Sequence, residues 1–159
     1  MFTAATPPLE RVYLGKRVSF LILNRFEAAA VALDVPYLIL SITDPERLEA
    51  TFAASPHQKA ILRLQFHDKS GPRAAASGKT AMTPEQARSI IAFVREHLAE
   101  VQLIICQCEA GISRSAAVVA ALSRILQGED SFFFTHYAPN DWIYHTLLEA
   151  ADGDNYATS

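Results

Sequence analysis

Short apolar runs separated by stretches of helix formers are the feature that most restricts the fold of this 159-residue chain. Residues 18–23 (VSFLIL) and 37–42 (YLILSI) are almost continuously apolar, as expected of strands buried on both faces of a parallel sheet. Between them, residues 25–33 (RFEAAAVAL) favour a helix, which Asp34 and Pro36 end. This strand, helix and strand unit predicts an α/β fold with both apolar runs as central strands.

The alternation continues along the rest of the chain. Two further strands are predicted at residues 60–66 (AILRLQF), nearer an edge, and at residues 101–105 (VQLII). Three further helices are predicted. One begins after Thr83, which is its cap, with Pro84 at the first position and Gln86 placed to complete a capping box. The other two cover residues 115–126 and 141–151.

We expect one domain over residues 1–159, with its core at about residues 18–151. Its sheet is expected to be mainly parallel, with four or five strands flanked by helices. Residues 67–82 and 129–140 lack periodicity and are predicted to be irregular, the first as a long loop of the kind that often serves as a functional lid.

Composition excludes several classes of protein. Fourteen basic and seventeen acidic residues give a net charge of −3, without the basic excess of a nucleic-acid binder. The sequence has two cysteines, Cys106 and Cys108, which are too few for the disulfide framework of a small secreted protein. The five histidines lack metal-ligand spacing. No apolar run approaches the roughly 20 residues that a bilayer demands. We therefore expect a cytoplasmic protein that binds no nucleic acid, membrane or metal.

The chemistry is expected in the segment CEAGISRS, at the carboxyl end of the strand at residues 101–105, because ligands of open α/β sheets bind at such ends. Backbone N–H groups that wrap into a helix N-terminus form a nest for anions, and the helix dipole adds positive charge. Gly111 permits this backbone conformation, and the planar fork of Arg114 can hold two phosphate oxygens. The segment therefore predicts a phosphate loop, lined by Glu109, Ala110, Gly111, Ile112, Ser113 and Arg114.

The same field favours the thiolate of Cys108, which makes this residue a candidate nucleophile. Ser115 can donate a hydrogen bond to the sulfur and improve it as a leaving group. The alternative is that Cys108 is only a small buried residue. Arg114 argues against that alternative, because a cation at the positive end of a helix is unfavourable unless an anion binds there.

CEAGISRS resembles the phosphate-binding loop of the cysteine-dependent protein tyrosine phosphatases, and the chain length and order of elements resemble the small dual-specificity phosphatases. The resemblance is specific over residues 106–127 and looser over residues 18–149. It implies that Cys108 forms a phosphocysteine intermediate, that Arg114 binds the phosphoryl group and that an upstream aspartate protonates the leaving oxygen. It implies no cofactor. The family usually has histidine before the cysteine, whereas this chain has Gln107, whose amide can still hydrogen-bond the turn.

Two aspartates are candidates for that acid. Asp68 follows the strand that ends at Phe66, so it is expected at the same sheet edge as Cys108, on a loop that can swing over a bound phosphate. Asp44 follows the second strand and can also reach this edge, or cap a turn before Pro45. Asp68 is the preferred assignment.

The predicted function is hydrolysis of phosphotyrosine or a related phosphomonoester, with an inorganic oxyanion as a further ligand of the loop. The loop carries no lysine and one acid, Glu109, which favours a phosphorylated protein side chain over polyanionic inositol phosphates. Two alternatives stay open: a catalytically inactive phosphate-binding module, and a sulfur-transfer or redox enzyme, which only Cys106 suggests. We expect strand alternation to hold Cys106 and Cys108 apart, so that Cys106 is a buried strand residue and not a disulfide partner.

Overall fold

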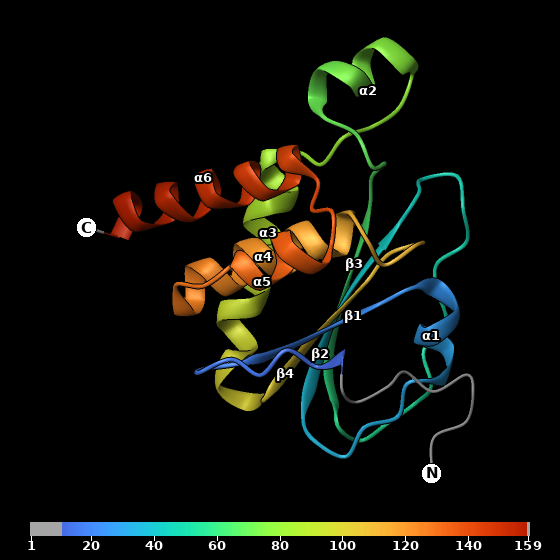
Figure 1. Cartoon of the computed structure of the whole chain (residues 1–159), viewed down its shortest axis with the longest axis vertical. Helices are drawn as coiled ribbons and strands as arrows, with labels where there is room; N and C mark the ends of the chain where they lie inside the picture. Colours follow the sequence, from blue (N-terminus) through green and yellow to red (C-terminus); the bar gives the residue numbers. More distant parts are fainter. Residues whose placement is uncertain (1–10, 159) are drawn as a thin grey trace.

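A parallel four-stranded sheet forms the centre of the molecule (Figure 1). The computed structural model describes residues 11–158, with side chains as far as residue 153. The strands are β1 (Ser19–Leu23), β2 (Tyr37–Thr43), β3 (Gln58–Gln65) and β4 (Leu103–Gln107). They lie in the order β1-β4-β2-β3, and each pair of neighbours is parallel. The predicted fold class is therefore confirmed, with four strands in the described part of the chain.

Helices cover the two faces of the sheet unequally. They are α1 (Arg25–Ala30), α2 (Gly71–Ser77), α3 (Pro84–His97), the short 3₁₀ helix η2 (Leu98–Glu100), α4 (Arg114–Gln127), α5 (Ser131–His136) and α6 (Asp141–Thr158). Helices α3, α4, α5 and α6 lie on one side of the sheet, and α1 lies on the other (Figure 1). None of the helices described is long and apolar enough to cross a bilayer.

The strand positions depart from prediction at one edge. β2 and β4 are central and buried at every residue, and β3 lies at an edge as its alternating sequence predicts. The prediction that residues 18–23 form a central strand is wrong, because β1 is the other edge. Tyr13 covers this edge through two backbone hydrogen bonds with Phe20, of 2.8 and 2.9 Å, so an edge strand here can be as apolar as a central one.

Two segments predicted to be irregular contain short helices. In residues 67–82, Ser70 caps α2 by accepting from the Arg73 backbone, and Gly78 ends it in the left-handed conformation with φ 68°. In residues 129–140, α5 packs by Phe133, which is buried. Both helices are shorter than the window of about 11–18 residues in which hydrophobic periodicity can be recognised, which is why the sequence pattern missed them.

The helix after Thr83 is confirmed in detail. Thr83 accepts from the Gln86 backbone, and the Gln86 side chain accepts from the Thr83 backbone, so the predicted capping box is complete. The helix buries Ile90, Ile91 and Val94 on its inner side. These residues recur at helical spacing and belong to the main core cluster, so one apolar stripe of the helix faces the core.

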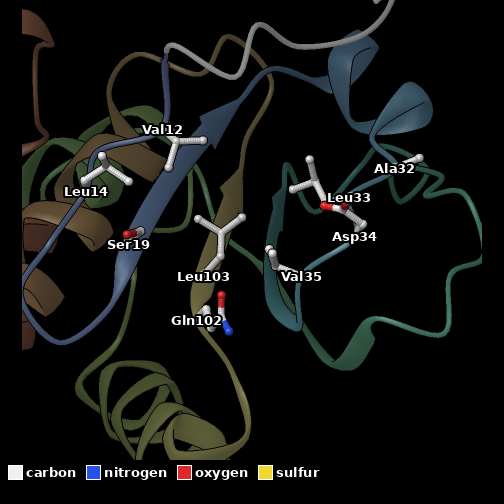
Figure 2. Close-up of a pocket in the computed structure, with 9 residues that line it drawn as sticks. All are labelled: Val12, Leu14, Ser19, Ala32, Leu33, Asp34, Val35, Gln102 and Leu103. Carbon is white, nitrogen blue, oxygen red and sulfur yellow. The ribbon is translucent and has the colours of Figure 1, made fainter. Parts of the chain in front are cut away.

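An apolar pocket of about 670 Å³ opens at the amino ends of β1 and β4, on the face that α1 covers (Figure 2). Leu103, Leu33 and Val35 contribute much of its apolar lining. Cys108 follows the opposite, carboxyl end of β4. This pocket is therefore at the end of the sheet away from the predicted phosphate loop.

Candidate active site

The phosphate loop, residues 108–114, folds back over the sulfur of Cys108. Cys108 follows the last residue of β4, and its N–H donates to the Leu23 carbonyl at the end of β1 (3.3 Å). The Gly111 N–H donates to Cys108 Sγ (3.3 Å), and Ser115 Oγ lies 2.9 Å from the same sulfur. The thiol is 2% exposed, so it forms the floor of the loop.

Gly111 is required in this loop for two reasons. Its φ is +68°, which side chains rarely adopt. A Cβ there would also lie 2.9 Å from the Asn24 nitrogen and 3.0 Å from the Leu23 carbonyl carbon. The loop therefore packs against the start of α1 so closely that only glycine fits.

The N-terminus of α4 keeps donors free to face the loop. The first bond of the helix runs from the Ala117 N–H to the Ser113 carbonyl (3.0 Å), so the preceding N–H groups have no acceptor within the helix. Ser113 stands at the capping position without making a side-chain cap. These N–H groups and the helix dipole make the loop a natural anion site.

Arg114 is held from behind. It is 6% exposed, and its Nη1 donates to Asp44 Oδ1 (2.6 Å) and to the Phe66 carbonyl (2.8 Å). Asp44 and Phe66 follow directly after β2 and β3. The ends of two strands thus fix the guanidinium plane, while its other donors stay outside this pair of bonds.

Asp68 lies at the rim of the phosphate loop. Its Oδ1 accepts from Ser113 Oγ (2.9 Å) and from Asn140 Nδ2 (2.8 Å), and the residue is exposed. The structure therefore brings Asp68, Asp44, Arg114, Ser115 and Cys108 to one edge of the sheet.

His67 fixes the backbone just before Asp68. Its Nδ1 accepts from the Thr80 N–H (2.9 Å), so Nε2 carries the hydrogen that it donates to Glu46 (2.8 Å). The His67 N–H also donates to the Thr80 carbonyl (2.6 Å). A backbone hydrogen bond to Glu46 and then the bond from His67 lower the pKa of the Glu46 carboxyl.

Glu109 points away from the centre of the loop, toward two arginines that the sequence analysis missed. Its carboxylate pairs with Arg25 at 3.1 Å and with Arg47 at 3.6 Å, and its carbonyl accepts from the Arg25 N–H (3.3 Å). Arg25 and Glu109 are 84 residues apart, and no sequence pattern marks the pair. The acid of the loop, Glu109, is therefore ion-paired with two arginines from other elements.

The two residues before Cys108 differ from expectation. The expectation that strand alternation separates Cys106 from Cys108 is wrong, because positions two apart share a face and both side chains belong to one core cluster. Both cysteines are free, and burial and then the neighbouring Cys108 raise the pKa of Cys106 well above its usual value.

Gln107 makes no described hydrogen bond to the turn. Its Oε1 accepts from Ser41 Oγ (2.6 Å), and its Nε2 is buried without a partner.

The arrangement suits a tetrahedral oxyanion. The Gly111 N–H donates to the thiol, two strand ends hold the guanidinium of Arg114, and the carboxylate of Asp68 bonds Ser113 in the same loop, so donors and an acid meet at one sheet edge. Among the residues that the structure describes, no three His, Cys, Asp or Glu side chains are grouped to hold a metal.

Solved structures share this fold at low sequence identity. A mouse protein assigned as a dual specificity phosphatase, complexed with zinc tungstate, is 16% identical, with a TM-score of 0.65 over 99% of this chain and 96% of its own. The human tyrosine phosphatase-like serine/threonine/tyrosine-interacting protein is 16% identical, with a TM-score of 0.62 over 93% and 97%. Human DUSP28 is 16% identical, with a TM-score of 0.63 over 93% and 99%.

No family model and no curated protein matches the chain. The fold is that of the small dual-specificity phosphatases, which confirms at the level of fold the resemblance drawn from CEAGISRS. The chain therefore has a phosphatase-like architecture, and its activity has to be argued from its own residues.

Proposed function

We propose that this protein is a cysteine-dependent phosphatase that hydrolyses phosphotyrosine or a related phosphomonoester through a phosphocysteine intermediate. The observation that carries the proposal is the position of Cys108 Sγ, 3.3 Å from the Gly111 nitrogen and 2.9 Å from Ser115 Oγ. A sulfur at the floor of an anion-binding loop is placed to attack a phosphorus atom that the loop holds.

In the first step, the Cys108 thiolate forms a bond to phosphorus as the bond from phosphorus to the ester oxygen breaks. The loop N–H groups and the free edge of the Arg114 guanidinium stabilise the equatorial oxygens. Asp68 gives its proton to the departing oxygen, which leaves as an alcohol or phenol. The products are phosphocysteine and the Asp68 carboxylate.

In the second step, the Asp68 carboxylate takes a proton from water while the water oxygen bonds to phosphorus. The bond from sulfur to phosphorus breaks, and inorganic phosphate and the Cys108 thiolate are released. Ser115 Oγ is placed to donate a hydrogen bond to the departing sulfur, because it lies 2.9 Å away. Asp68 ends the cycle protonated, as it began.

The contacts of the two aspartates support the assignment of Asp68 as the acid. Asp44 accepts from Arg114 at 2.6 Å, so its place is behind the guanidinium, where it orients the fork. Asp68 uses Oδ1 for both of its described hydrogen bonds. Its other oxygen therefore remains available to carry the transferred proton.

Charge around the loop supports a phosphomonoester on a protein or small molecule as substrate. Apart from Arg114, the loop has no cation, and the two arginines beside it, Arg25 and Arg47, are engaged by Glu109. Further phosphate groups would find no free cation on the loop itself, which disfavours polyanionic inositol phosphates. The free cysteines suit a reducing compartment, and the cytoplasm is the proposed location.

Turnover of p-nitrophenyl phosphate tests the proposal, with Cys108→Ser as the inactive variant and Cys106→Ser as the matched control. We expect activity in the wild type and in Cys106→Ser, none in Cys108→Ser, and competition by tungstate or vanadate for the loop. The proposal falls if the wild type is inactive on every monoester, or if Cys108→Ser keeps the activity.

A phosphate-binding module without turnover is the second candidate. It is favoured by Gln107, whose side chain bonds Ser41 instead of the turn that carries Cys108. Retained tungstate binding with no hydrolysis would support the module and exclude the enzyme. Persulfide formation at Cys108 with thiosulfate would instead support sulfur transfer.

A further inference from the structure

The apolar pocket at the amino ends of β1 and β4 is built from separate parts of the chain (Figure 2). Val12, Leu14 and Ser19 form one side, residues 32–35 form the other, and Leu103 lies between them. The volume of about 670 Å³ is within the range of about 300–1,000 Å³ that is typical of small-molecule sites. The pocket is therefore large enough to hold a small organic ligand.

The connection between α1 and β2 gives the pocket an apolar wall. Ala32, Leu33 and Val35 line the pocket, and Ala32 is exposed while the other two are half-buried. On the facing side, Leu14 is 81% exposed. Connections at a protein surface are normally polar, and neighbouring apolar side chains that stay open to water mark places where a ligand binds. The two walls therefore indicate a site for an apolar group.

Polar contacts to a ligand have to come from side chains. The backbone of Gln102 is already engaged, since its N–H donates to the Pro36 carbonyl (3.0 Å) and its carbonyl accepts from the Ser19 N–H (3.0 Å). The polar side chains of the lining belong to Ser19, Gln102 and Asp34. Two of these are neutral, so Asp34 determines the charge of the pocket.

Asp34 is an unpaired acid. Of the described residues that line the pocket, only Asp34 is ionisable. The residue is exposed, and within the described part of the chain its carboxylate has no hydrogen-bond or ion-pair partner. A negative charge without a counterion attracts a cation and repels an anion. The pocket is therefore complementary to a ligand that is apolar and positively charged.

From the apolar walls and this unpaired carboxylate, we infer that the pocket binds a small amphiphilic cation, such as an amine on an apolar chain or ring. The apolar body lies against Leu33, Val35 and Leu103, and the charged group faces Asp34. This site is independent of the proposed phosphatase function. The five residues of β4, about 16 Å of strand, separate it from Cys108.

Binding of decylammonium to the full chain tests the inference. Decanoate has a similar apolar chain with the opposite charge, and butylammonium has the same charge with six fewer methylenes. By titration calorimetry, below the concentrations at which these probes form micelles, we expect decylammonium to bind about fivefold to tenfold more tightly than decanoate. It should bind at least a hundredfold more tightly than butylammonium, because the short chain buries less apolar surface.

A matched pair of variants locates the binding. Ala32→Arg places a guanidinium beside Asp34 from an exposed lining position, and should weaken decylammonium binding by at least about tenfold. Ala29→Arg adds the same charge at an exposed position of α1 outside the lining, and should stay within about twofold of the wild type. Asp34→Asn should remove the preference for decylammonium over decanoate. Circular dichroism checks that each variant is folded.

Several outcomes would overturn the inference. Equal affinities for decylammonium and decanoate, equal titrations of Ala32→Arg and Ala29→Arg, or competition between decylammonium and tungstate would each do so. Absence of decylammonium binding would do so as well, and would leave the phosphatase proposal intact because turnover of p-nitrophenyl phosphate tests that proposal separately. A wild type that sediments as a dimer, together with a monomeric Leu14→Glu variant, would assign the pocket to a second copy of the chain instead.

Discussion

The phosphate loop and the segment that carries Asp68 meet at one sheet edge, but they are held there differently. In the phosphate loop, the contacts to Cys108 Sγ come from Gly111 and Ser115, three and seven residues away. Asp68 is held by Ser113 and Asn140, which lie 45 and 72 residues away in the chain. The bonds to the sulfur therefore come from the same turn, whereas the bonds to Asp68 come from separate parts of the fold.

This difference separates two kinds of function. A loop that binds the phosphoryl group acts on every phosphomonoester, whatever its leaving group. An acid at the rim matters only when the leaving oxygen needs a proton. Variants of the two regions should therefore differ in their dependence on the leaving group as well as in size.

The largest effect is expected for Cys108→Ser. The hydroxyl is nearly the same size as the thiol but does not ionise near neutral pH, so turnover should be lost on phenyl and dinitrophenyl phosphates alike. Tungstate titration and circular dichroism should show that the loop and fold persist. Measurable hydrolysis by a Cys108→Ser preparation free of wild-type protein would remove the covalent mechanism.

Arg114→Lys should come next, with kcat/KM reduced by about 10²–10³-fold on both substrates. An ammonium keeps the charge but cannot hold Asp44, the Phe66 carbonyl and two phosphate oxygens with one planar group. Steady-state kinetics on the two substrates provide the measurement. A lysine variant with nearly normal kinetics would place the guanidinium outside the site.

Asp68→Asn should lower kcat on phosphotyrosine by about 10²-fold with little change in KM, and much less on dinitrophenyl phosphate. The ratio of the loss in kcat on phosphotyrosine to the loss on dinitrophenyl phosphate distinguishes variants of the Asp68 segment from variants of the phosphate loop. Asp44→Asn is the matched comparison, since it changes the acceptor of Arg114 and should affect both substrates equally. An unchanged Asp68→Asn rate, with a leaving-group-dependent loss in Asp44→Asn, would transfer the acid role to Asp44.

The smallest effect is expected for Thr83→Ala. Loss of the side-chain cap on α3 should lower the free energy of unfolding by about 1 kcal/mol. Urea unfolding measures this change, and kinetics on either substrate should not move. A change in the ratio of the two rates would mean that the Asp68 segment depends on α3 more than its contacts suggest.

The features that could be predicted from the sequence are those that neighbouring residues determine. Cys108, Gly111 and Arg114 could be placed because strand end, tight turn and helix start follow one another directly. The capping box of Thr83 and Gln86 could be placed for the same reason.

The contacts that could not be predicted from the sequence depend on the tertiary structure. Asn140 is recognisable as a helix cap, but nothing local shows that its amide reaches Asp68. No local pattern marks the pairing of Glu109 with Arg25 and Arg47 either, because side chains so far apart in the chain meet only after the sheet has formed. Asp44 lies at this edge, which is one of the two positions that the sequence allows, but no local signal predicts its bond to Arg114.

Trapping the phosphoenzyme tests the central claim most directly. The protein is mixed with p-nitrophenyl phosphate, quenched within the first turnover and analysed by mass spectrometry, in a Cys106→Ser background so that Cys108 is the only cysteine. Ser115→Ala should increase the trapped fraction, because it removes the donor 2.9 Å from the departing sulfur. The account predicts one phosphoryl group, located on Cys108. Turnover without any phosphoenzyme, or a phosphoryl group on another residue, would contradict it.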